Sequence, residues 1–328
     1  MASHALHDLR RRTVVQLMLG ALAIAALTST TALAADKIRI GKPEATGFVF
    51  SAAEVGVEAG IFKKHNIDIE TISFAGGAKM HQAMAAKTID MALGSGPEMA
   101  FIPKGSPEKG VAAMAGAPLS IVVLVRGDSD YKTIDDLKGR TIGVSNPGAL
   151  TYWLAGELAK RKGWGPEGFK RVPLGGMDGM VAGLLAKNVD SIVGNTEIGY
   201  KLQAEGKVKL IGRFGEIIPD FITHVIFASN DMIEKNPDAI RRFLKAWYET
   251  VSFMRANKEE TIRIATKVTG FSPEFAESIY REQMPMFLDN GRFDPKGVEV
   301  LKQSFIDLKI LPDKPQNDQL FTEAFLPK

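Results

Sequence analysis

The chain has 328 residues, a length that suits two domains of ordinary size. Hydrophobic residues make up 45% and charged residues 24%, which is typical of a folded, soluble protein and excludes a disordered or fibrous chain. Cysteine is absent, which excludes disulfides, thiolate metal sites, a cysteine nucleophile and a lipid-modified cysteine. The formal charge is only +3 and the 41 basic residues are spread along the chain, which argues against a nucleic-acid binder.

Residues 1–34 have the pattern of a secretory signal. Three arginines at 10–12 precede a hydrophobic run at 14–27, and small residues at Ala32 and Ala34 form a cleavage site. The run is shorter than the roughly 20 residues of a membrane span, so a transmembrane anchor is the less favoured interpretation. We expect cleavage near Ala34 or Ala35, which would leave an exported, periplasmic protein with a formal charge of +1. The arginines do not decide between general and twin-arginine export.

Residues 37–225 alternate short strand-like runs with helical patterns. The first set predicts strands at 37–41, 67–74 and 89–93, with helices at 51–64 and 78–86. The second set predicts strands at 141–144, 170–174 and 191–193, with helices at 148–162 and 177–186. This alternation predicts the α/β class, with βαβ units around mostly parallel sheets.

The two sets repeat one another with an offset of 100 residues. The first-set residues in register are Gly76, Met80, Asp90 and Gly94, and the second-set residues that match them are Gly176, Met180, Asp190 and Gly194. A coincidence within glycine-rich sequence is the weaker interpretation. The repeat predicts two similar lobes whose strand-to-helix loops face a shared ligand.

The rest of the chain, from about Ser229, is predicted to be helical. Asn236, Ser272 and Asp294 each precede a proline, which is the pattern of a helix start. An apolar stripe with spacings of three and four follows the first of these starts, and it predicts a core-facing helix. The stripe consists of Ile240, Phe243, Leu244, Trp247, Val251 and Met254.

No pattern of catalytic or metal-binding residues is present. The histidines beyond the signal, His65, His81 and His224, are far apart, and the chain lacks HExxH, GxSxG, SxxK, P-loop and GxGxxG motifs. His81 and His224 are better explained as structural residues than as bases, although the role of His224 stays open. The sequence therefore predicts binding rather than catalysis, with no metal and no cofactor.

Two segments carry a resemblance to a known family. Residues 58–70 (EAGIFKKHNIDIE) and 136–144 (DLKGRTIGV) resemble segments of nitrate/sulfonate/taurine-type periplasmic solute-binding proteins of ABC transporters. This group includes proteins that bind aliphatic sulfonates or thiamine-pyrimidine precursors. The resemblance implies a type II periplasmic-binding-protein fold, with two doubly wound α/β lobes, two crossover segments and C-terminal helices. The implied boundaries are 35–126 plus 225–328 for lobe one and 127–224 for lobe two, with crossings near 125–129 and 223–228.

Loops that lead from strands into helices are predicted to hold the ligand, because ligands in such sheets bind there. In lobe one the candidate residues are Thr46, Gly47, Phe48, Phe50, Gly76, Gly77, Ala78, Ser95, Gly96 and Pro97. In lobe two they are Ser145, Asn146, Gly148, Ala149, Leu150, Asn195, Thr196 and Glu197.

The chemistry of these loops favours a small organic anion. Helix starts present free backbone N–H groups and a partial positive charge, and Ser145 and Asn146 suit either ligand binding or helix capping. Glu197 is unfavourable beside an anion, and its role stays open between bonding an amine and facing solvent. Lys42 and Lys79 are weaker candidates for added charge. Four aromatic residues are candidates for apolar walls or for core: Phe48, Phe50, Tyr152 and Trp153.

The leading hypothesis is a monomeric receptor, not an enzyme, that delivers a sulfonate, carboxylate or related nitrogen or sulfur compound to a membrane permease. One alternative is an enzyme on the same scaffold, since pyrimidine-precursor synthases share it, but those enzymes use a cysteine-rich segment. Another is a sensory module that presents its ligand to a membrane receptor. The sequence does not identify the ligand or separate transport from sensing.

Overall fold

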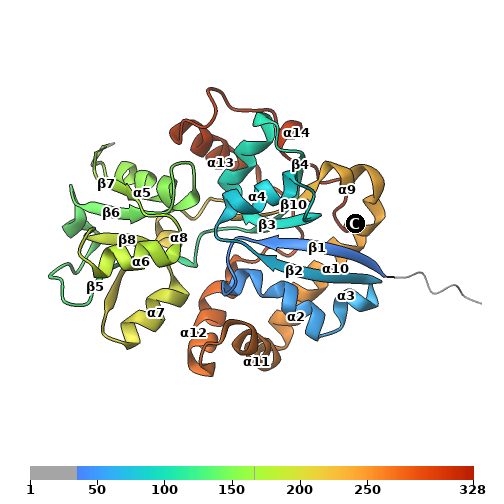
Figure 1. The fold of residues 1–328 in the computed structure, drawn as a ribbon, viewed down its shortest axis with the longest axis horizontal. Helices are drawn as coiled ribbons and strands as arrows, with labels where there is room; N and C mark the ends of the chain where they lie inside the picture. Colours follow the sequence, from blue (N-terminus) through green and yellow to red (C-terminus); the bar gives the residue numbers. More distant parts are fainter. Residues whose placement is uncertain (1–34, 166) are drawn as a thin grey trace, which may run out of the picture. The chain divides into compact units, whose positions relative to one another are not determined.

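A computed structural model describes residues 35–165 and 167–328. The predicted signal and its cleavage site therefore lie outside the described residues, except for Ala35. Residues 36–328 form one compact unit that contains two five-stranded mixed sheets (Figure 1). No helix within the described ranges is long and apolar enough to cross a membrane.

The two sheets have the same arrangement of parallel and antiparallel strands. The first has the order β2-β1-β3-β10-β4, and its strands are β1 (Asp36–Lys42), β2 (Ile67–Ser73), β3 (Met91–Ser95), β4 (Glu108–Ala115) and β10 (His224–Ser229). The second has the order β7-β6-β8-β5-β9, and its strands are β5 (Ile121–Arg126), β6 (Thr141–Val144), β7 (Lys170–Pro173), β8 (Ser191–Asn195) and β9 (Val208–Arg213). In each sheet the first three strands are parallel, and the fourth pairs antiparallel with both neighbours. The α/β prediction is confirmed.

The internal repeat of the sequence also appears in the hydrogen bonds of the structure. Asp90 Oδ2 accepts the N–H of Arg39 at 2.9 Å, and Asp190 Oδ2 accepts the N–H of Thr141 at 2.9 Å. Lys87 and Lys187 also share a left-handed backbone, with φ of 60° and 64°. Each half therefore joins its second crossover helix, α4 or α6, to its third parallel strand, β3 or β8, with the same aspartate and the same turn.

Helices cover both sheets. The first half contributes η2 (Phe48–Phe50), α2 (Ala52–Glu58), α3 (Ile61–Lys64), α4 (Gly77–Ala85) and η3 (Gly96–Lys104). The second half contributes η4 (Ile134–Leu137), α5 (Leu150–Arg161), α6 (Met177–Leu185), α7 (Thr196–Ala204) and α8 (Phe214–Ile217). The single helix predicted at 51–64 is wrong, because Gly60 adopts φ 71° and divides it into α2 and α3.

The C-terminal part is helical, as the sequence predicts. It consists of α9 (Asn230–Lys235), α10 (Pro237–Ala256), α11 (Lys258–Thr269), α12 (Pro273–Gln283), η5 (Met284–Met286), α13 (Pro295–Asp307) and α14 (Asn317–Leu320). Ser272 and Asp294 cap α12 and α13 through their side chains, whereas Asn236 makes no such bond. All six residues of the apolar stripe on α10 are buried in the core.

The strand β5 lies in the second sheet, although the implied boundary at 126 assigns it to lobe one. It pairs antiparallel with both β8 and β9 and lies between them. The chain therefore passes from the first sheet to the second between Ala115 and Ile121. It returns after α8, and His224 is already the first residue of β10 in the first sheet.

Candidate functional site

The two halves meet through loops that the sequence singles out. Phe48 N–H donates to Glu197 Oε1 at 3.0 Å, and both residues are buried. Phe48 begins η2 after β1, and Glu197 lies in the first turn of α7, directly after β8. The structure thus brings together one predicted residue from each half. Thr46 of the same loop is exposed, and Gly47 is buried beside Glu44.

Gln283, at the end of α12, joins this contact and was not predicted. Its Nε2 donates to Thr196 Oγ1 at 2.8 Å and to Glu197 Oε1 at 3.0 Å. Its Oε1 is buried without a hydrogen-bond partner among the described residues. Gln283 lies 86 residues along the chain from Glu197, so no local sequence signal could have linked them.

A second carboxylate makes the site acidic. Burial and the charge of Glu197 raise the pKa of Glu44 to about 7. Burial also raises the pKa of Glu197, although hydrogen bonds from Phe48 and Gln283 oppose the shift. The charge of Lys42 opposes the raised pKa of Glu44 without cancelling it, and Lys42 Nζ is itself paired with Glu54 Oε1 at 2.5 Å. Glu44, like Gln283, was missed by the sequence analysis.

The predicted anion site at the start of α4 is filled by the protein itself. A Cβ on Gly77 would lie 1.7 Å from Glu98 Oε1, so this carboxylate packs directly against the first turn of α4. Glu98 Oε2 accepts the N–H of Ser95 at 2.8 Å and bonds His81 Nε2 at 3.0 Å. The partial positive charge of the helix start is thus already offset by an internal carboxylate.

Replacing Gly77 by alanine is expected to lower the free energy of unfolding by about 1–3 kcal/mol, because the new methyl group would displace a carboxylate held by two hydrogen bonds. Chemical denaturation of the variant measures the loss. Gly176→Ala is the matched control, since a Cβ there has no atom within 4 Å. Equal losses in the two variants would contradict the close packing of Glu98.

The predicted loops of the second half serve mainly to start helices. Ser145 N–H donates to Thr151 Oγ1 at 2.9 Å, and Asn195 Oδ1 accepts the N–H of Ile198 at 2.9 Å to cap α7. Asn146 is exposed, and Gly148 and Ala149 are partly buried just before α5. The first turn of α5, like that of α4, contains no acidic residue of its own.

The aromatic residues predicted at the site do not share one environment. Phe48 packs edge-on against Tyr280 and Phe287 in the core. Phe50 contacts the ring of His224, with centroids 5.1 Å apart. Burial lowers the pKa of His224 to about 4, and its Nδ1 has no hydrogen-bond partner among the described residues. His224 is therefore a neutral, incompletely bonded imidazole beside Phe50.

His81 forms a buried charge cluster beneath the first-half loops. Its Nε2 lies 3.0 Å from Glu98 Oε2 and its Nδ1 lies 2.9 Å from Glu108 Oε1. Burial opposes a charged imidazole, but the bonds to Glu108 and Glu98 outweigh it and raise the pKa of His81 to about 10. Both nitrogens are thus used within the fold. Within residues 35–165 and 167–328, no group of three or more His, Asp or Glu side chains is placed to hold a metal ion.

Known proteins with similar sequences include binding proteins and enzymes. A Brucella abortus (strain 2308) protein, which its name describes only as a binding protein, is 27% identical over 224 residues, covering 66% of this chain and 67% of the relative. The 4-amino-5-hydroxymethyl-2-methylpyrimidine phosphate synthase of Candida albicans (strain WO-1) is 23% identical over 214 residues, covering 61% of this chain and 62% of the enzyme.

Solved structures share the fold. One is the alkanesulfonate-binding protein SsuA from Xanthomonas axonopodis pv. citri, bound to MOPS, which matches with a TM-score of 0.75 at 15% sequence identity. The match covers 87% of this chain and 98% of the SsuA chain. Another is the periplasmic nitrate-binding protein NrtA from Synechocystis PCC 6803, which matches with a TM-score of 0.72 at 15% sequence identity. The match covers 88% of this chain and 86% of the NrtA chain. The bilobal α/β fold is that of the periplasmic binding proteins, as the resemblance implied. Because the NMT1/THI5-like family model matches residues 48–261, more than half of the sequence, the chain belongs to the NMT1/THI5-like family.

Proposed function

We propose that the protein is the extracytoplasmic solute receptor of an ABC import system, which binds a small organic molecule between its halves and delivers it to a membrane permease. The fold shared with sulfonate- and nitrate-binding proteins supports this role. The proposed lobes are residues 35–118 plus 223–328 and residues 119–222, with a periplasmic location after removal of the signal. Crossings at 116–120 and 218–223 would act as the hinge.

The observation that carries the ligand class is the buried carboxylate of Glu197. Its Oε1 is bonded by Phe48 and Gln283, whereas Oε2 accepts, among the side chains that the structure describes, only the Thr196 hydroxyl at 3.2 Å. A carboxylate oxygen has two lone-pair positions, so Oε2 can accept a further donor. A solute with an amino group would supply that donor and offset the negative charge shared with Glu44. We therefore favour an amine-bearing solute over a simple anion.

The relatives support an amino-heterocycle within this class. The name of the Candida albicans synthase specifies a 4-aminopyrimidine as its product. Such a ring offers an exocyclic N–H donor for Glu197 and a ring nitrogen that can accept a proton from Glu44. The neutral imidazole of His224, buried beside Phe50, would supply a further polar contact through Nδ1, which has no hydrogen-bond partner among the described residues.

The second candidate is the organic anion that the sequence predicts. One observation favours it: α5 is a 12-residue helix with no acidic side chain in its first turn, so its N-terminus can still attract a negative group. An enzymatic role is the weaker alternative. Relatives at 21–23% identity are synthases, but His81 is bonded at both ring nitrogens and this chain has no cysteine.

A thermal-shift screen of residues 35–328 tests the receptor role and the ligand class together. The panel contains 4-aminopyrimidines, primary alkylamines, alkanesulfonates, aromatic acids, nitrate and bicarbonate. A solute at one hundred times its dissociation constant stabilises the protein by about 2.7 kcal/mol. If nothing in the panel raises the melting temperature, the receptor proposal fails. If only the anions do, the amine class is wrong and the second candidate replaces it.

The pH dependence of affinity separates the two classes. Glu44 faces Glu197 and Lys42, and Lys42 is paired with Glu54, so Glu44 loses its proton near its pKa of about 7. A primary alkylamine stays cationic between pH 5.5 and 8.5. It should bind more tightly as the pH rises and Glu44 becomes charged, whereas an anion should bind more weakly. Calorimetric titration at pH 5.5 and at pH 8.5 shows whether the affinity for each solute rises or falls with pH.

Glu197→Gln is expected to weaken amine binding by about 10- to 100-fold, because the bond to a charged acceptor is replaced by one to a neutral amide. The substitution keeps the size of the side chain and an acceptor for Phe48. Glu205→Gln, at the exposed end of α7, is the matched control. Unchanged amine affinity in Glu197→Gln would remove Glu197 from the site.

A further inference from the structure

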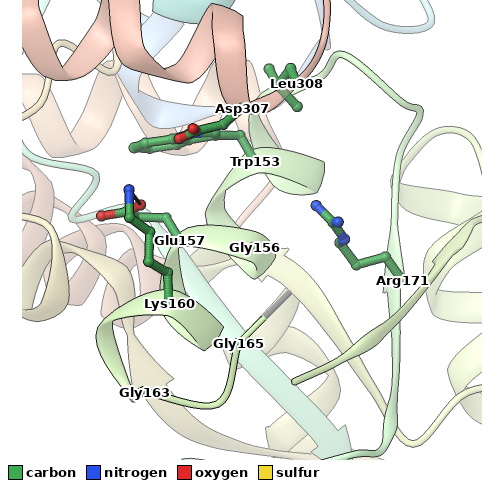
Figure 2. A pocket seen from close by; sticks show the side chains of 9 residues that line it. All are labelled: Trp153, Gly156, Glu157, Lys160, Gly163, Gly165, Arg171, Asp307 and Leu308. Carbon is green, nitrogen blue, oxygen red and sulfur yellow. Dashed lines mark hydrogen bonds and ion pairs between the residues drawn. The ribbon is translucent and has the colours of Figure 1, made fainter. Parts of the chain in front are cut away.

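A cavity of about 490 Å³ lies beside α5, and none of its lining residues belongs to the loops around Phe48 and Glu197. One wall is α5 of the second half. Another is the end of α13, with Asp307 and Leu308. Figure 2 shows Arg171 on one side of this space, with Glu157 and Lys160 on the other. This volume lies within the range of small-molecule sites.

Trp153 contributes only the edge of its indole to the cavity, because the residue is 2% exposed. The indole stacks on Phe221, with centroids 4.6 Å apart and planes at 15°, so it is held rigidly from behind. Its Nε1 lies 3.3 Å from Asp307 Oδ2, which fixes the ring further. Because so little of Trp153 is exposed, an apolar group in the cavity would touch Leu308 and the edge of the indole, and would not stack on the indole face.

The acidic side chains around the cavity already have partners. Glu157 pairs with Arg161 at 2.8 Å and with Lys160 at 3.5 Å. Asp307 accepts hydrogen bonds from Trp153 and, at 3.0 Å, from Gln303. These internal bonds reduce the cost of placing an anion nearby.

Arg171 differs from the other charged groups of the lining. Its guanidinium lies 4.2 Å from the centre of the Tyr152 ring, and one of its N–H groups donates to the Tyr152 carbonyl at 3.4 Å. No carboxylate within the described ranges forms an ion pair with it. Gly156 makes room for it, because a Cβ there would lie 2.8 Å from Arg171 Nη1. The guanidinium is thus positioned by stacking, with donors to spare for an anion.

We propose that this cavity binds an organic anion, with its carboxylate or sulfonate on Arg171 and its apolar part against Leu308 and the exposed edge of Trp153. The site is separate from the one formed around Glu197, and it does not depend on the proposed receptor role. Because its walls come from α5 and from the end of α13, the bound molecule contacts both the second half and the C-terminal helices.

Calorimetric titration of residues 35–328 with 2-naphthoate tests the site, and 2-naphthol serves as the uncharged probe of similar shape. We expect one saturable site for 2-naphthoate, at least about tenfold weaker binding of 2-naphthol, and quenching of tryptophan fluorescence that is lost in Trp153→Phe. Equal affinities for the two probes, or no saturation by 2-naphthoate, would overturn the proposal.

Substitutions of Arg171 and of its neighbour Lys170 test which positive charge binds the anion. Arg171→Gln should weaken 2-naphthoate binding at least about tenfold, and Arg171→Lys should weaken it less. Lys170→Gln removes the same charge from the adjacent, exposed residue of β7 and should leave the affinity unchanged. Melting temperatures without ligand confirm that the variants fold. Full affinity in folded Arg171→Gln, or an equal loss in Lys170→Gln or Glu197→Gln, contradicts the site.

Discussion

Replacing His81 by leucine should lower the free energy of unfolding by about 3–5 kcal/mol, because it leaves two buried carboxylates without their cation. His81, Glu98 and Glu108 are 4%, 8% and 1% exposed, so water cannot replace the lost partner. Urea denaturation near pH 6 measures the effect. Adding Glu98→Gln and Glu108→Gln to the leucine variant should restore part of the stability, since the uncompensated charges are then gone.

His65→Leu is the matched control for this prediction. His65 also bonds a glutamate, with Nε2 2.7 Å from Glu249 Oε2, but Glu249 is 34% exposed. Its loss should cost about 1 kcal/mol or less, because water solvates the remaining carboxylate. Losses of equal size at the two histidines would show that the His81 cluster does not depend on burial.

The stability contributed by His81 should also depend on pH. Its pKa rises from 6.5 to about 10 on folding, so the folded state holds a proton that the unfolded state releases. The contribution is fully present below about pH 6.5 and is lost as the pH rises toward 10. The difference in stability between the protein and His81→Leu should therefore narrow across this window. A constant difference from pH 6 to 10 would mean that the imidazole is neutral.

Trp247→Ala is expected to cost about 3–5 kcal/mol, through the loss of buried surface and the cavity that it leaves. Trp247 is fully buried on α10 and packs against Phe243, with ring centroids 6.0 Å apart. Its Nε1 has no hydrogen-bond partner among the described residues, so Trp247→Phe should cost much less than the alanine variant. Both are measured by chemical denaturation.

Lys245→Ala, on the exposed face of the same helix, controls for changes in helix propensity and should alter stability by less than about 0.5 kcal/mol. If Trp247→Ala costs no more than Lys245→Ala, α10 does not supply the core contacts assigned to it.

The regular elements were predictable because their signals are local. The strand at 141–144 and the helix starts at Pro237, Pro273 and Pro295 lie where hydrophobic spacing and the residues before each proline place them. The placement of β5 was not predictable, since a continuous apolar strand suits either sheet. Its partners β8 and β9 were fixed only by the arrangement of the whole second half.

Part of the candidate site was also predictable, because some of its residues carry local sequence signals. Phe48 and Glu197 follow strands in a recognisable pattern, so their loops could be identified. Glu44 and Gln283 give no such signal, because their roles depend on contacts with residues far along the chain. The surroundings of the start of α4 could not be predicted from the sequence. The sequence shows two glycines that suit an anion, but only the fold shows that Glu98 already occupies the space beside them.

The position of β10 determines the order in which the sheets can be completed. All five strands of the second sheet lie between Ile121 and Arg213, in one uninterrupted stretch. The first sheet lacks its antiparallel fourth strand until His224–Ser229 is available to enter between β3 and β4. During synthesis or translocation, the middle of the chain can therefore fold first, and the sides of β3 and β4 that β10 later covers stay unpaired for longer.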